Sequence, residues 1–433
     1  MNKEYILTVI GAGSTYTPEL IDGIIRCQET LSFREIRLMD IDERKLSIVG
    51  GLCCRMMKAA GLKCEMIMTQ DLDTSLKNAD FVITQIRVGR LPARILDETI
   101  PLKYDLIGQE TTGIGGFFKA LRTIPEMLKI AKRMEELCPD AFLINFTNPS
   151  GIITQAISDN SSIRVIGLCN IPINMVADIS ANMGLENVNV QYIGLNHLSW
   201  ITKLESDGKD YLSEAIEKGI NAVPMKNINA SGFSRECLKM AGGIPCCYLE
   251  YFYNRTQKLA EQKAAKKCRG EVCMEIEEEL LRIYADNDLH VKPKQLGERG
   301  GSKYSLAAVS LIDAIANDKK EMHIVGVKNG QTLPFLQADD VIEVACIVGA
   351  DGVKPILVKD FQNEHIIEMM RTIKAYERHT VKAAVSGSEE EAMHALVIHP
   401  LVGDFNVANA CFQEMKLAHA KYLPTFFEKG QDV

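Results

Sequence analysis

Short apolar runs alternate with segments of helical periodicity along the first half of the chain. The apolar runs, which we expect to form strands, lie at 5–10, 35–39, 64–68, 81–84, 142–145, 165–168 and 190–194. The helical patterns begin near residue 18 and continue at 43–60 and 123–137. Strands that alternate with helices predict an α/β fold whose core is a Rossmann-like, doubly wound parallel sheet.

The pattern changes after about residue 200. Residues 256–282 form a long charged helical stretch, and helical periodicity returns from residue 361 onward. Because no flexible linker separates the halves, we predict a dinucleotide-binding domain at 1–170 and a C-terminal α+β domain at 171–433 that packs against it. The polar, glycine-rich segment 87–118 is predicted to be a long functional loop.

Composition narrows the class of protein. The chain has 433 residues, 24% of them charged, and a formal net charge of -8, which disfavours nucleic acid and anionic membranes as main partners. An anionic ligand would therefore need a local cluster of arginines. The sequence contains no run of 18 apolar residues and its first residues do not form a signal peptide, so we expect a cytoplasmic protein whose 13 scattered cysteines are reduced.

A glycine motif follows the first predicted strand. Gly11 and Gly13 would let the backbone approach a pyrophosphate, whose charge the following helix N-terminus stabilises. Asp40 ends the next strand, where its carboxylate would bind a ribose hydroxyl and repel the 2′-phosphate of NADP. We therefore predict NAD binding, as against an ordinary tight turn. The residues expected to bind the cofactor are Gly11, Gly13, Ser14, Thr15 and Asp40.

Three arginines occur within eight residues of the predicted loop. Arg87, Arg90 and Arg94 could hold a phosphate or a carboxylate by bidentate hydrogen bonds. The same spacing is equally compatible with an exposed surface that only serves solubility.

Further polar residues follow predicted strands 142–145, 165–168 and 190–194. Asn148 follows the first, Cys169 and Asn170 follow the second, and His197 follows the third. The carboxyl ends of parallel strands form the ligand crevice of an open sheet, so Cys169 and His197 could bind one metal ion there. Taken singly, each is compatible with a structural role, and together they would ordinarily suggest zinc.

The ordered motifs of the chain, taken together, resemble those of family 4 of the glycoside hydrolases. Those motifs are Gly11-x-Gly-Ser, Arg94-x-x-Asp-Glu, Gly108-Gln-Glu-Thr-x-Gly, Asn148-Pro-Ser, Cys169-Asn-x-Pro, Gly194-Leu-Asn-His, Pro245-x-x-Tyr-Leu-x-Tyr and Arg299-Gly-Gly-x-x-Tyr-Ser. The match runs from residue 7 to about 306. Asp105 and Ile114 depart from the glycine and proline expected at those positions.

The resemblance implies an NAD-dependent glycosidase, a class that departs from two-carboxylate hydrolysis. NAD would take a hydride from carbon 3 of a sugar 6-phosphate and later return it. The oxidation makes the proton on carbon 2 acidic, so that the aglycone is eliminated and water adds. A divalent metal ion, usually manganese, would be held by Cys169 and His197 and would act as a Lewis acid.

The resemblance also assigns roles to individual residues. Tyr248 matches the family's base, with Tyr251 as the alternative. The residues expected to contact substrate are Arg94, Glu110, Asn148, Asn170 and Arg299. Asn170 cannot protonate a leaving oxygen as the aspartate of α-specific relatives can, which favours 6-phospho-β-glucosides. Relatives imply a homodimer or homotetramer.

Three other hypotheses remain open. An NAD-dependent hydroxy-acid dehydrogenase would share the N-terminal motif but would need no metal and would accumulate NADH. A protein that only senses NAD would bind the cofactor and cleave no glycoside. An α-specific member of the same family is disfavoured by Asn170.

Overall fold

The first six strands form a parallel sheet in the order β3-β2-β1-β4-β5-β6. The computed structural model describes residues 4–221, 231–299 and 304–427. The six strands are β1 (Tyr5–Ile10), β2 (Phe33–Met39), β3 (Glu65–Thr69), β4 (Phe81–Thr84), β5 (Phe142–Asn145) and β6 (Arg164–Gly167). This is the strand order of a Rossmann-type sheet, as the alternating pattern predicted.

The sheet continues into the C-terminal half with antiparallel strands, so that the described strands form one mixed sheet of 13. The added strands are β7 (Asn189–Leu195), β8 (Leu198–Ser206), β9 (Lys209–Asp210), β10 (Ile244–Pro245), β11 (Glu321–Lys328), β12 (Val341–Gly349) and β13 (Gly352–Pro355). The junction is made where Gly326 of β11 pairs with Gly167 of β6. The predicted division between residues 170 and 171 stays a prediction, and the sheet runs across it.

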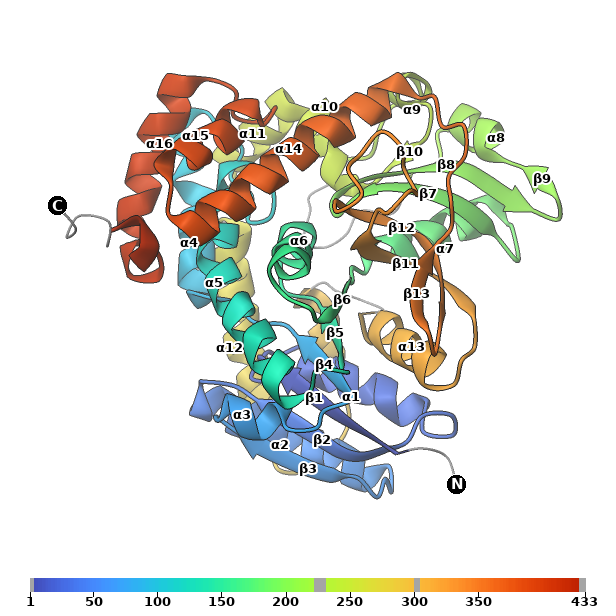
Figure 1. The fold of residues 1–433 in the computed structure, drawn as a ribbon, viewed down its shortest axis with the longest axis vertical. Helices are drawn as coiled ribbons and strands as arrows, with labels where there is room; N and C mark the ends of the chain where they lie inside the picture. The colour runs from blue at the N-terminus through green and yellow to red at the C-terminus, as the bar shows by residue number, and fades with distance from the viewer. Residues whose placement is uncertain (1–3, 222–230, 300–303, 428–433) are drawn as a thin grey trace.

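Helices cover both faces of the parallel strands (Figure 1). On one face α1 packs against α2 and α13, and on the other α5 packs against α3 and α6. These helices are α1 (Thr17–Arg26), α2 (Glu43–Ala59), α3 (Leu72–Leu76), α5 (Gly113–Leu137), α6 (Ser150–Asn160) and α13 (Tyr304–Ala316). Strands β1, β4 and β5 are buried almost throughout, which explains why they read as continuous apolar runs.

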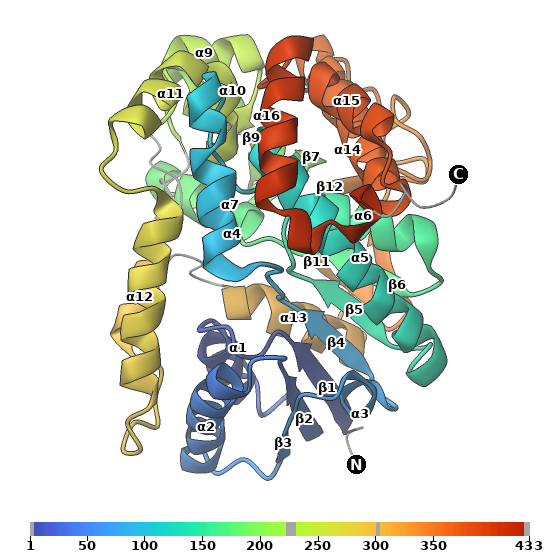
Figure 2. The ribbon, with the colours of Figure 1, turned by 90° about the vertical axis from the view of Figure 1, so that its left-hand side faces the viewer.

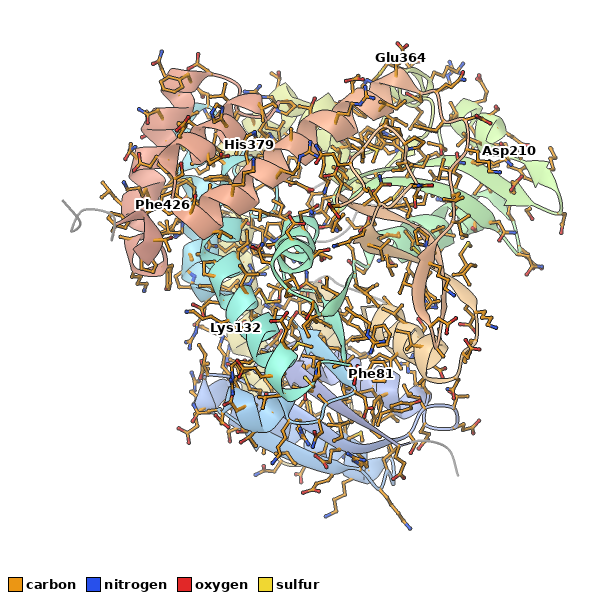
Figure 3. All side chains as sticks on the ribbon, in the orientation of Figure 1. Phe81, Lys132, Asp210, Glu364, His379 and Phe426 are labelled. Carbon is orange, nitrogen blue, oxygen red and sulfur yellow. The ribbon has the colours of Figure 1, made fainter. Side chains whose placement is uncertain are left out.

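The C-terminal helices pack on the outer side of α5 (Figure 1). They are α14 (Glu364–Ser386), α15 (Glu389–Ile398) and α16 (Phe405–Ala418), followed by the 3₁₀ turns η4 (Ala420–Tyr422) and η5 (Pro424–Phe426). Side chains fill the space between these layers (Figure 3). The N-terminal half of α5 is consequently buried on all sides.

The remaining helices are distributed over both halves of the chain. They are α4 (Arg90–Thr99), α7 (Ile171–Met183), α8 (Leu212–Glu217), α9 (Arg235–Ala241), α10 (Glu250–Tyr253), α11 (Arg255–Ala264) and α12 (Arg269–Tyr284), with 3₁₀ turns η1 (Pro101–Tyr104), η2 (Cys247–Leu249) and η3 (Lys294–Arg299). Figure 2 shows α12 running down beside α2, and it also packs against α4. The single helical stretch predicted at 256–282 is therefore two helices.

The prediction of a long loop at 87–118 was wrong. This segment contains α4, η1 and the start of α5. The segment is polar although it is packed inside the protein, because its charged side chains form buried ion pairs. Arg94, Asp97 and Glu98 are each at most 5% exposed. Its glycines allow the start of α5 to pack closely against the segment before it, since a Cβ on Gly115 would lie 2.4 Å from the carbonyl oxygen of Gln109.

Candidate active site

The turn after β1 has the close packing that the glycine motif predicted. Gly11 has φ +87°, and a Cβ there would lie 2.9 Å from the backbone of Gln85. A Cβ on Gly13 would lie 2.8 Å from the Asp40 carboxylate, which accepts a hydrogen bond of 2.8 Å from the Gly13 amide. Asp40 thus both closes the turn and lies at the end of β2, where it is partly exposed.

One cavity of about 1250 Å³ extends from this turn across the ends of the parallel strands. The predicted site residues that line it are Gly11, Gly13, Ser14, Asp40, Arg94, Glu110, Asn148, Cys169, Asn170, His197, Tyr248 and Arg299. Thr15 is not among the described residues of its wall. It is buried beneath the turn, where its carbonyl accepts a hydrogen bond from Tyr284 and its hydroxyl contacts Arg299.

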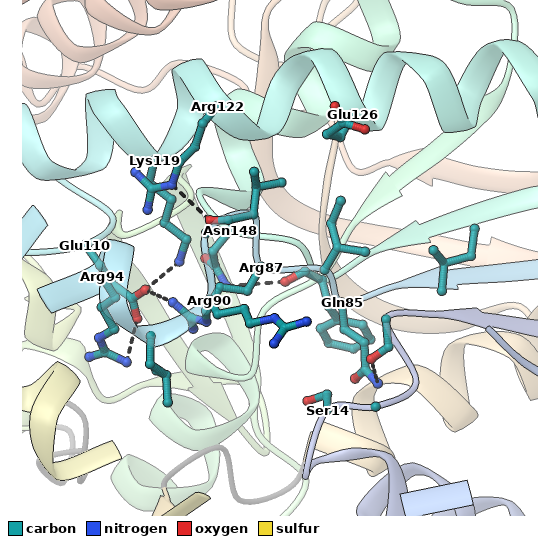
Figure 4. Close-up of a pocket in the computed structure, with 18 of the residues that line it drawn as sticks. Ser14, Gln85, Arg87, Arg90, Arg94, Glu110, Lys119, Arg122, Glu126 and Asn148 are labelled. Atoms are coloured by element: carbon teal, nitrogen blue, oxygen red, sulfur yellow. Dashed lines mark hydrogen bonds and ion pairs between the residues drawn. The ribbon is translucent and has the colours of Figure 1, made fainter. Parts of the chain in front are cut away.

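A cluster of charges forms one wall of the cavity (Figure 4). The Glu110 carboxylate receives Lys119 at 2.6 Å, Arg94 at 2.9 Å and Arg87. Burial alone would raise the pKa of Glu110, but the charges of Arg87, Arg94 and Lys119 hold it well below its usual value. Glu110 therefore stays ionised and keeps three basic side chains together in an otherwise acidic protein. Burial, and then the charge of Arg87, lowers the pKa of Lys119 to about 7, so Arg87 and Arg94 are the permanent cations of the group.

The two arginines expected to bind substrate are already held by protein groups. Arg94 also pairs with Glu98 at 2.7 Å and is 5% exposed. Arg299 lies 3.5 Å from Glu277 and its guanidinium stacks on the ring of Tyr16. Among the three cations on Glu110, Arg87 is the most open, because 28% of its side chain is exposed. These ion pairs fix the positions of the cations before any ligand arrives.

Cys169 and His197 lie together at the far end of the cavity. The Cys169 Sγ atom is 3.7 Å from Nε2 of His197. Burial, and then the nearby Glu343 carboxylate, raises the pKa of the Cys169 thiol. Burial, and then the charge of Lys119, lowers the pKa of His197 to about 3, so its imidazole is neutral. A neutral imidazole has a free lone pair, which is the form that binds a metal ion.

The route by which these two residues meet differs from the expected one. Strand β7 is separated from β6 by β11 and β12, and each of the three pairings is antiparallel. The prediction that His197 follows a parallel strand was therefore wrong. The residues still meet because of the register of the strands between them. Gly326 of β11 pairs with Gly167 of β6 on one side and with Glu343 of β12 on the other, and Glu343 pairs with Gly194 of β7. The ends of β6 and β7 therefore lie on one row of the sheet.

Tyr248 and Tyr251 occupy different surroundings. The Tyr248 ring stacks face to face on His197, with ring centroids 3.8 Å apart and 6° between the planes. Tyr251 is not among the described residues of the cavity wall and lies near Glu98 and Arg94. Burial, and then Cys247, raises the pKa of Tyr248 well above its usual value. Ionisation of Tyr248 would thus require a cation beside it.

Asn148 presents an unused acceptor. Its Nδ2 donates to the carbonyl of Phe146 at 3.3 Å, whereas Oδ1 is buried and has no hydrogen-bond partner in the described parts of the chain. Buried polar atoms are nearly always paired, so this oxygen is suited to a ligand hydroxyl. Asn170 lies nearby at the start of α7 and also lines the cavity.

Sequence reasoning missed Lys119, and it assigned no role to Thr111. Lys119 lies three residues before Arg122 in the otherwise apolar start of α5, and two cations at helical spacing in such a stretch were a usable signal. Residues 300–303 of the last motif lie outside the described residues.

Two further expectations concern the whole chain. Each of the 13 cysteines, all within the described residues, is a free thiol. Among the described helices, none is both long and apolar enough to cross a membrane.

Comparison with known proteins finds matches along nearly the whole chain. The family 4 glycosyl hydrolase model matches residues 6–185, and the model of that family's C-terminal domain matches residues 192–402. A probable 6-phospho-β-glucosidase of Bacillus subtilis is 42% identical, and the alignment covers 99% of each chain.

Solved structures agree with this. The 6-phospho-β-glucosidase of Thermotoga maritima with NAD and glucose 6-phosphate has a TM-score of 0.90 at 32% identity and covers 97% of this chain and 99% of its own. A second structure of that enzyme contains manganese as well. A malate dehydrogenase of Plasmodium falciparum has a TM-score of 0.54 at 10% identity over 88% of this chain and 99% of its own, and this likeness shows the fold alone. The predicted Rossmann-like α/β class is confirmed.

Proposed function

Since the chain belongs to family 4 of the glycosyl hydrolases, we propose that it hydrolyses 6-phospho-β-glucosides with the help of NAD and a divalent metal ion, Mn²⁺ above all. The observation that carries the proposal is the placement of Cys169, His197 and Tyr248 in the same cavity as the glycine turn after β1. Oxidation-assisted elimination requires a cofactor site and a metal-ligand pair that open into one cavity, so that NAD can reach a sugar held at the metal ion.

The cofactor end suits NAD. The amides of the turn after β1 and the N-terminus of α1 would bind the pyrophosphate, and Gly11, Gly13 and Ser14 line that end of the cavity. The Asp40 carboxylate would accept a ribose hydroxyl and would repel a 2′-phosphate. We assign Thr15 to the support of this turn and of Arg299.

The far end suits a divalent metal ion. Two ligands that each lie about 2.0–2.3 Å from one ion are separated by a distance similar to the observed 3.7 Å when they coordinate side by side. No further His, Cys, Asp or Glu joins them as a group of three in the described part of the chain. The remaining coordination positions would thus be open to substrate oxygens and water, as a catalytic site needs.

The chemistry divides between the bound groups and the chain. When bound, NAD would accept and return the hydride at carbon 3, and the metal ion would stabilise negative charge on the sugar oxygens. Tyr248 would remove the proton from carbon 2, and the cation beside it would favour its ionised form. The unpaired Oδ1 of Asn148 would accept a hydrogen bond from a sugar hydroxyl and so orient the ring.

The cationic wall would bind the 6-phosphate. Arg94 and Arg299 are held in place by carboxylates, and Arg87 is the more open of the cations on Glu110. Glu110 would act by keeping these cations together, since its own charge opposes a phosphate. Because the cations are positioned in advance, less conformational entropy is lost when the anion binds.

Asn170 supports the β-linked class of substrate. Its amide lines the cavity but has no ionisable proton to give to a leaving oxygen. This favours substrates that lose the aglycone by elimination and need no acid at this position. An α-specific activity of the same family is the second candidate, and it would need another acid.

Paired nitrophenyl glucoside 6-phosphates test the proposal. We expect the β-anomer to be hydrolysed only when NAD and Mn²⁺ are both present, with no net NADH formed. Accumulation of NADH in proportion to substrate would overturn the proposal in favour of a hydroxy-acid dehydrogenase. Retention of full activity in excess EDTA would contradict the metal requirement, and NAD binding without turnover of either anomer would indicate a sensor.

A further inference from the structure

His197 has a hydrogen-bond partner at each ring nitrogen. Nε2 is directed at the Cys169 sulfur, 3.7 Å away, and Nδ1 lies 3.1 Å from the hydroxyl oxygen of Thr111. A neutral imidazole carries one proton, so only one nitrogen can bind a metal ion. The neighbours of Thr111 determine which nitrogen that is.

The side chain of Gln109 has only one possible orientation. Its terminal oxygen Oε1 accepts the backbone amides of Thr111 at 2.5 Å and of Thr112 at 3.0 Å. Backbone N–H groups are obligate donors, so the atom that faces them must be the amide oxygen and not the NH₂ group. The orientation of Gln109 is therefore the same for either tautomer of His197.

The orientation of Gln109 fixes the direction of the next hydrogen bond. The Thr111 hydroxyl lies 2.9 Å from the same Gln109 oxygen, which cannot donate, so Thr111 must donate its single proton to it. The hydroxyl oxygen can then only accept from His197. His197 must therefore carry its proton on Nδ1, and the lone pair of Nε2 is directed toward Cys169.

We propose that Thr111 is a positioning residue that holds His197 in the tautomer able to bind the metal ion, with Gln109 and the amides of residues 111 and 112 setting the direction of the Thr111 hydroxyl. The inference rests on the proposed function in that it takes Cys169 and His197 as the metal ligands. Thr111 contacts no reacting atom in this scheme and acts through the imidazole.

Packing around the pair keeps this geometry in place. The His197 backbone adopts a left-handed conformation with φ +66°, and its ring is stacked on Tyr248. The Thr111 backbone lies against α5, where a Cβ on Gly116 would come within 2.4 Å of it. Neither His197 nor Thr111 can move away without disturbing a packed element. Loss of the Thr111 hydroxyl therefore leaves Nδ1 of His197 in place without its hydrogen-bond acceptor.

Metal affinity in the absence of substrate tests the inference without using activity. Free Mn²⁺ is measured by electron paramagnetic resonance during titration of the full-length protein. Thr111→Val removes the hydroxyl at nearly constant shape and should weaken Mn²⁺ binding about 10- to 100-fold, the usual effect of losing a group that orients a metal ligand. Thr111→Ser keeps the hydroxyl and should stay within about threefold of the wild type, well below that loss. Thr112→Val is the matched control, since Gln109 holds the backbone amide of Thr112.

The tautomer itself gives a second readout. Long-range ¹H–¹⁵N correlation spectra of the metal-free protein with ¹⁵N-labelled histidine should place the His197 proton on Nδ1 in the wild type and in Thr111→Ser. In Thr111→Val the proton should move to Nε2 in a large share of molecules. The signal is assigned by its loss in His197→Gln.

Wild-type Mn²⁺ affinity in Thr111→Val, or an Nε2 proton in the wild type, would overturn the inference. If Thr111→Val does not fold, Thr111→Ala removes the same hydroxyl with a smaller side chain and is judged by the same measurements. If the wild type itself binds no Mn²⁺, the metal part of the proposed function fails, whereas equal binding by wild type and variant refutes only the role of Thr111.

Discussion

Tyr248 combines the position of a base with surroundings that oppose its ionisation. Its ring faces His197, a proposed metal ligand, with ring centroids 3.8 Å apart, yet burial raises the pKa of the phenol well above its usual value. A base in such a place works only when a cation is present to favour the phenolate. In the proposed mechanism, the function of Tyr248 therefore depends on a metal ion bound at Cys169 and His197.

Tyr248→Phe keeps the stacked ring and removes the ionisable oxygen. We expect the turnover rate to fall by about 10²–10⁴, the usual contribution of a positioned general base, while substrate affinity changes much less. Wild-type product formed in deuterated water should carry deuterium at carbon 2, which NMR of the sugar measures. Tyr251→Phe is the control and should retain most of the rate. Complete retention of hydrogen at carbon 2 would exclude elimination.

Asn170 tests the linkage preference. The wild type should leave α-glucoside 6-phosphates with poor leaving groups intact, because the amide has no proton to donate. Asn170→Asp should introduce weak cleavage of such α-substrates and should lower, at most modestly, the rate on β-substrates. Chromatographic assay of α- and β-linked phosphorylated disaccharides checks this. Faster cleavage of the α-linked compounds by the wild type would contradict the preference.

Glu343 predicts a pH-dependent stability. It is 3% exposed and accepts hydrogen bonds from Tyr192 and Asn196, and burial raises its pKa to about 7. A folded-state pKa above the unfolded value means that the native state binds the extra proton. Its contribution to stability is therefore complete below about pH 4.5 and is lost as the pH rises through 7.

Chemical unfolding of Glu343→Gln and the wild type at pH 5 to 8.5 measures this contribution. The free energy of unfolding of the wild type should fall relative to Glu343→Gln by on the order of 3 kcal/mol across that range. The pH dependence of the difference in unfolding free energy is the test, since a difference that is constant with pH reflects altered hydrogen bonds. Glu205→Gln, at a half-buried position of β8 where the carboxylate pairs with Lys203, is the control. Parallel pH profiles of the wild type and Glu343→Gln would contradict the prediction.

At the scale of residues, much of the site could be predicted because its chemistry depends on residue types at fixed places in the sequence. A predicted strand, the glycine turn after it and a second predicted strand were enough to identify Gly11, Gly13 and Asp40 as cofactor residues, and all three line the cavity. Lys119 and the role of Thr111 could not, because each depends on contacts that only the folded chain creates. Thr15 was placed by its position in the motif, whereas its side chain contacts Arg299.

At the scale of elements, the apolar pattern predicted β1, β4 and β5 to the residue, since buried parallel strands are short and uniformly apolar. It failed for α4 and the start of α5. There the helices bury charged residues that neutralise one another, as in the pair of Arg122 with Asp97. A hydrophobicity pattern cannot recognise a helix whose buried side is charged. The predicted direction of β7 was wrong as well, because it depends on antiparallel pairing with β12 and β11, which lie far away in the sequence.

The glycines of α5 yield a prediction at this scale. Gly115→Ala would ordinarily stabilise a helix by about 0.5–1 kcal/mol. Here the added methyl group would lie 2.4 Å from the carbonyl oxygen of Gln109 and 2.5 Å from that of Asp97, and neither backbone atom can yield easily. We expect a net loss of about 1–3 kcal/mol in the free energy of unfolding.

Urea unfolding of matched helical variants checks this. Gly51→Ala in α2 is the control, since the only atom near its added methyl group is the flexible end of Arg55 at 3.4 Å. It should be neutral or slightly stabilising. A Gly115→Ala variant as stable as Gly51→Ala would show that the segment around Gln109 adjusts freely.

At the scale of the whole molecule, one sheet and one cavity join the two halves of the chain. The cavity wall takes Gly11 and Asp40 from the first half and His197, Tyr248 and Arg299 from the second. The chain carries a net charge of -8, yet Arg87, Arg94 and Lys119 gather around Glu110 in the cavity wall, where they form a local complement for an anionic ligand. Assembly as a homodimer or homotetramer stays a prediction, which sedimentation velocity would test.

The continuous sheet predicts how the molecule unfolds. Because β11 pairs with β6 and both halves line the cavity, we expect one cooperative thermal transition by scanning calorimetry. NAD at about 100 times its dissociation constant should stabilise the native state by about 2.7 kcal/mol and move that whole transition upward. Asp40→Ala should keep the single transition and lose most of the NAD-dependent shift. Two resolved transitions, of which NAD moves only one, would instead mean that residues 1–170 unfold as an independent domain and that the shared sheet does not couple the halves.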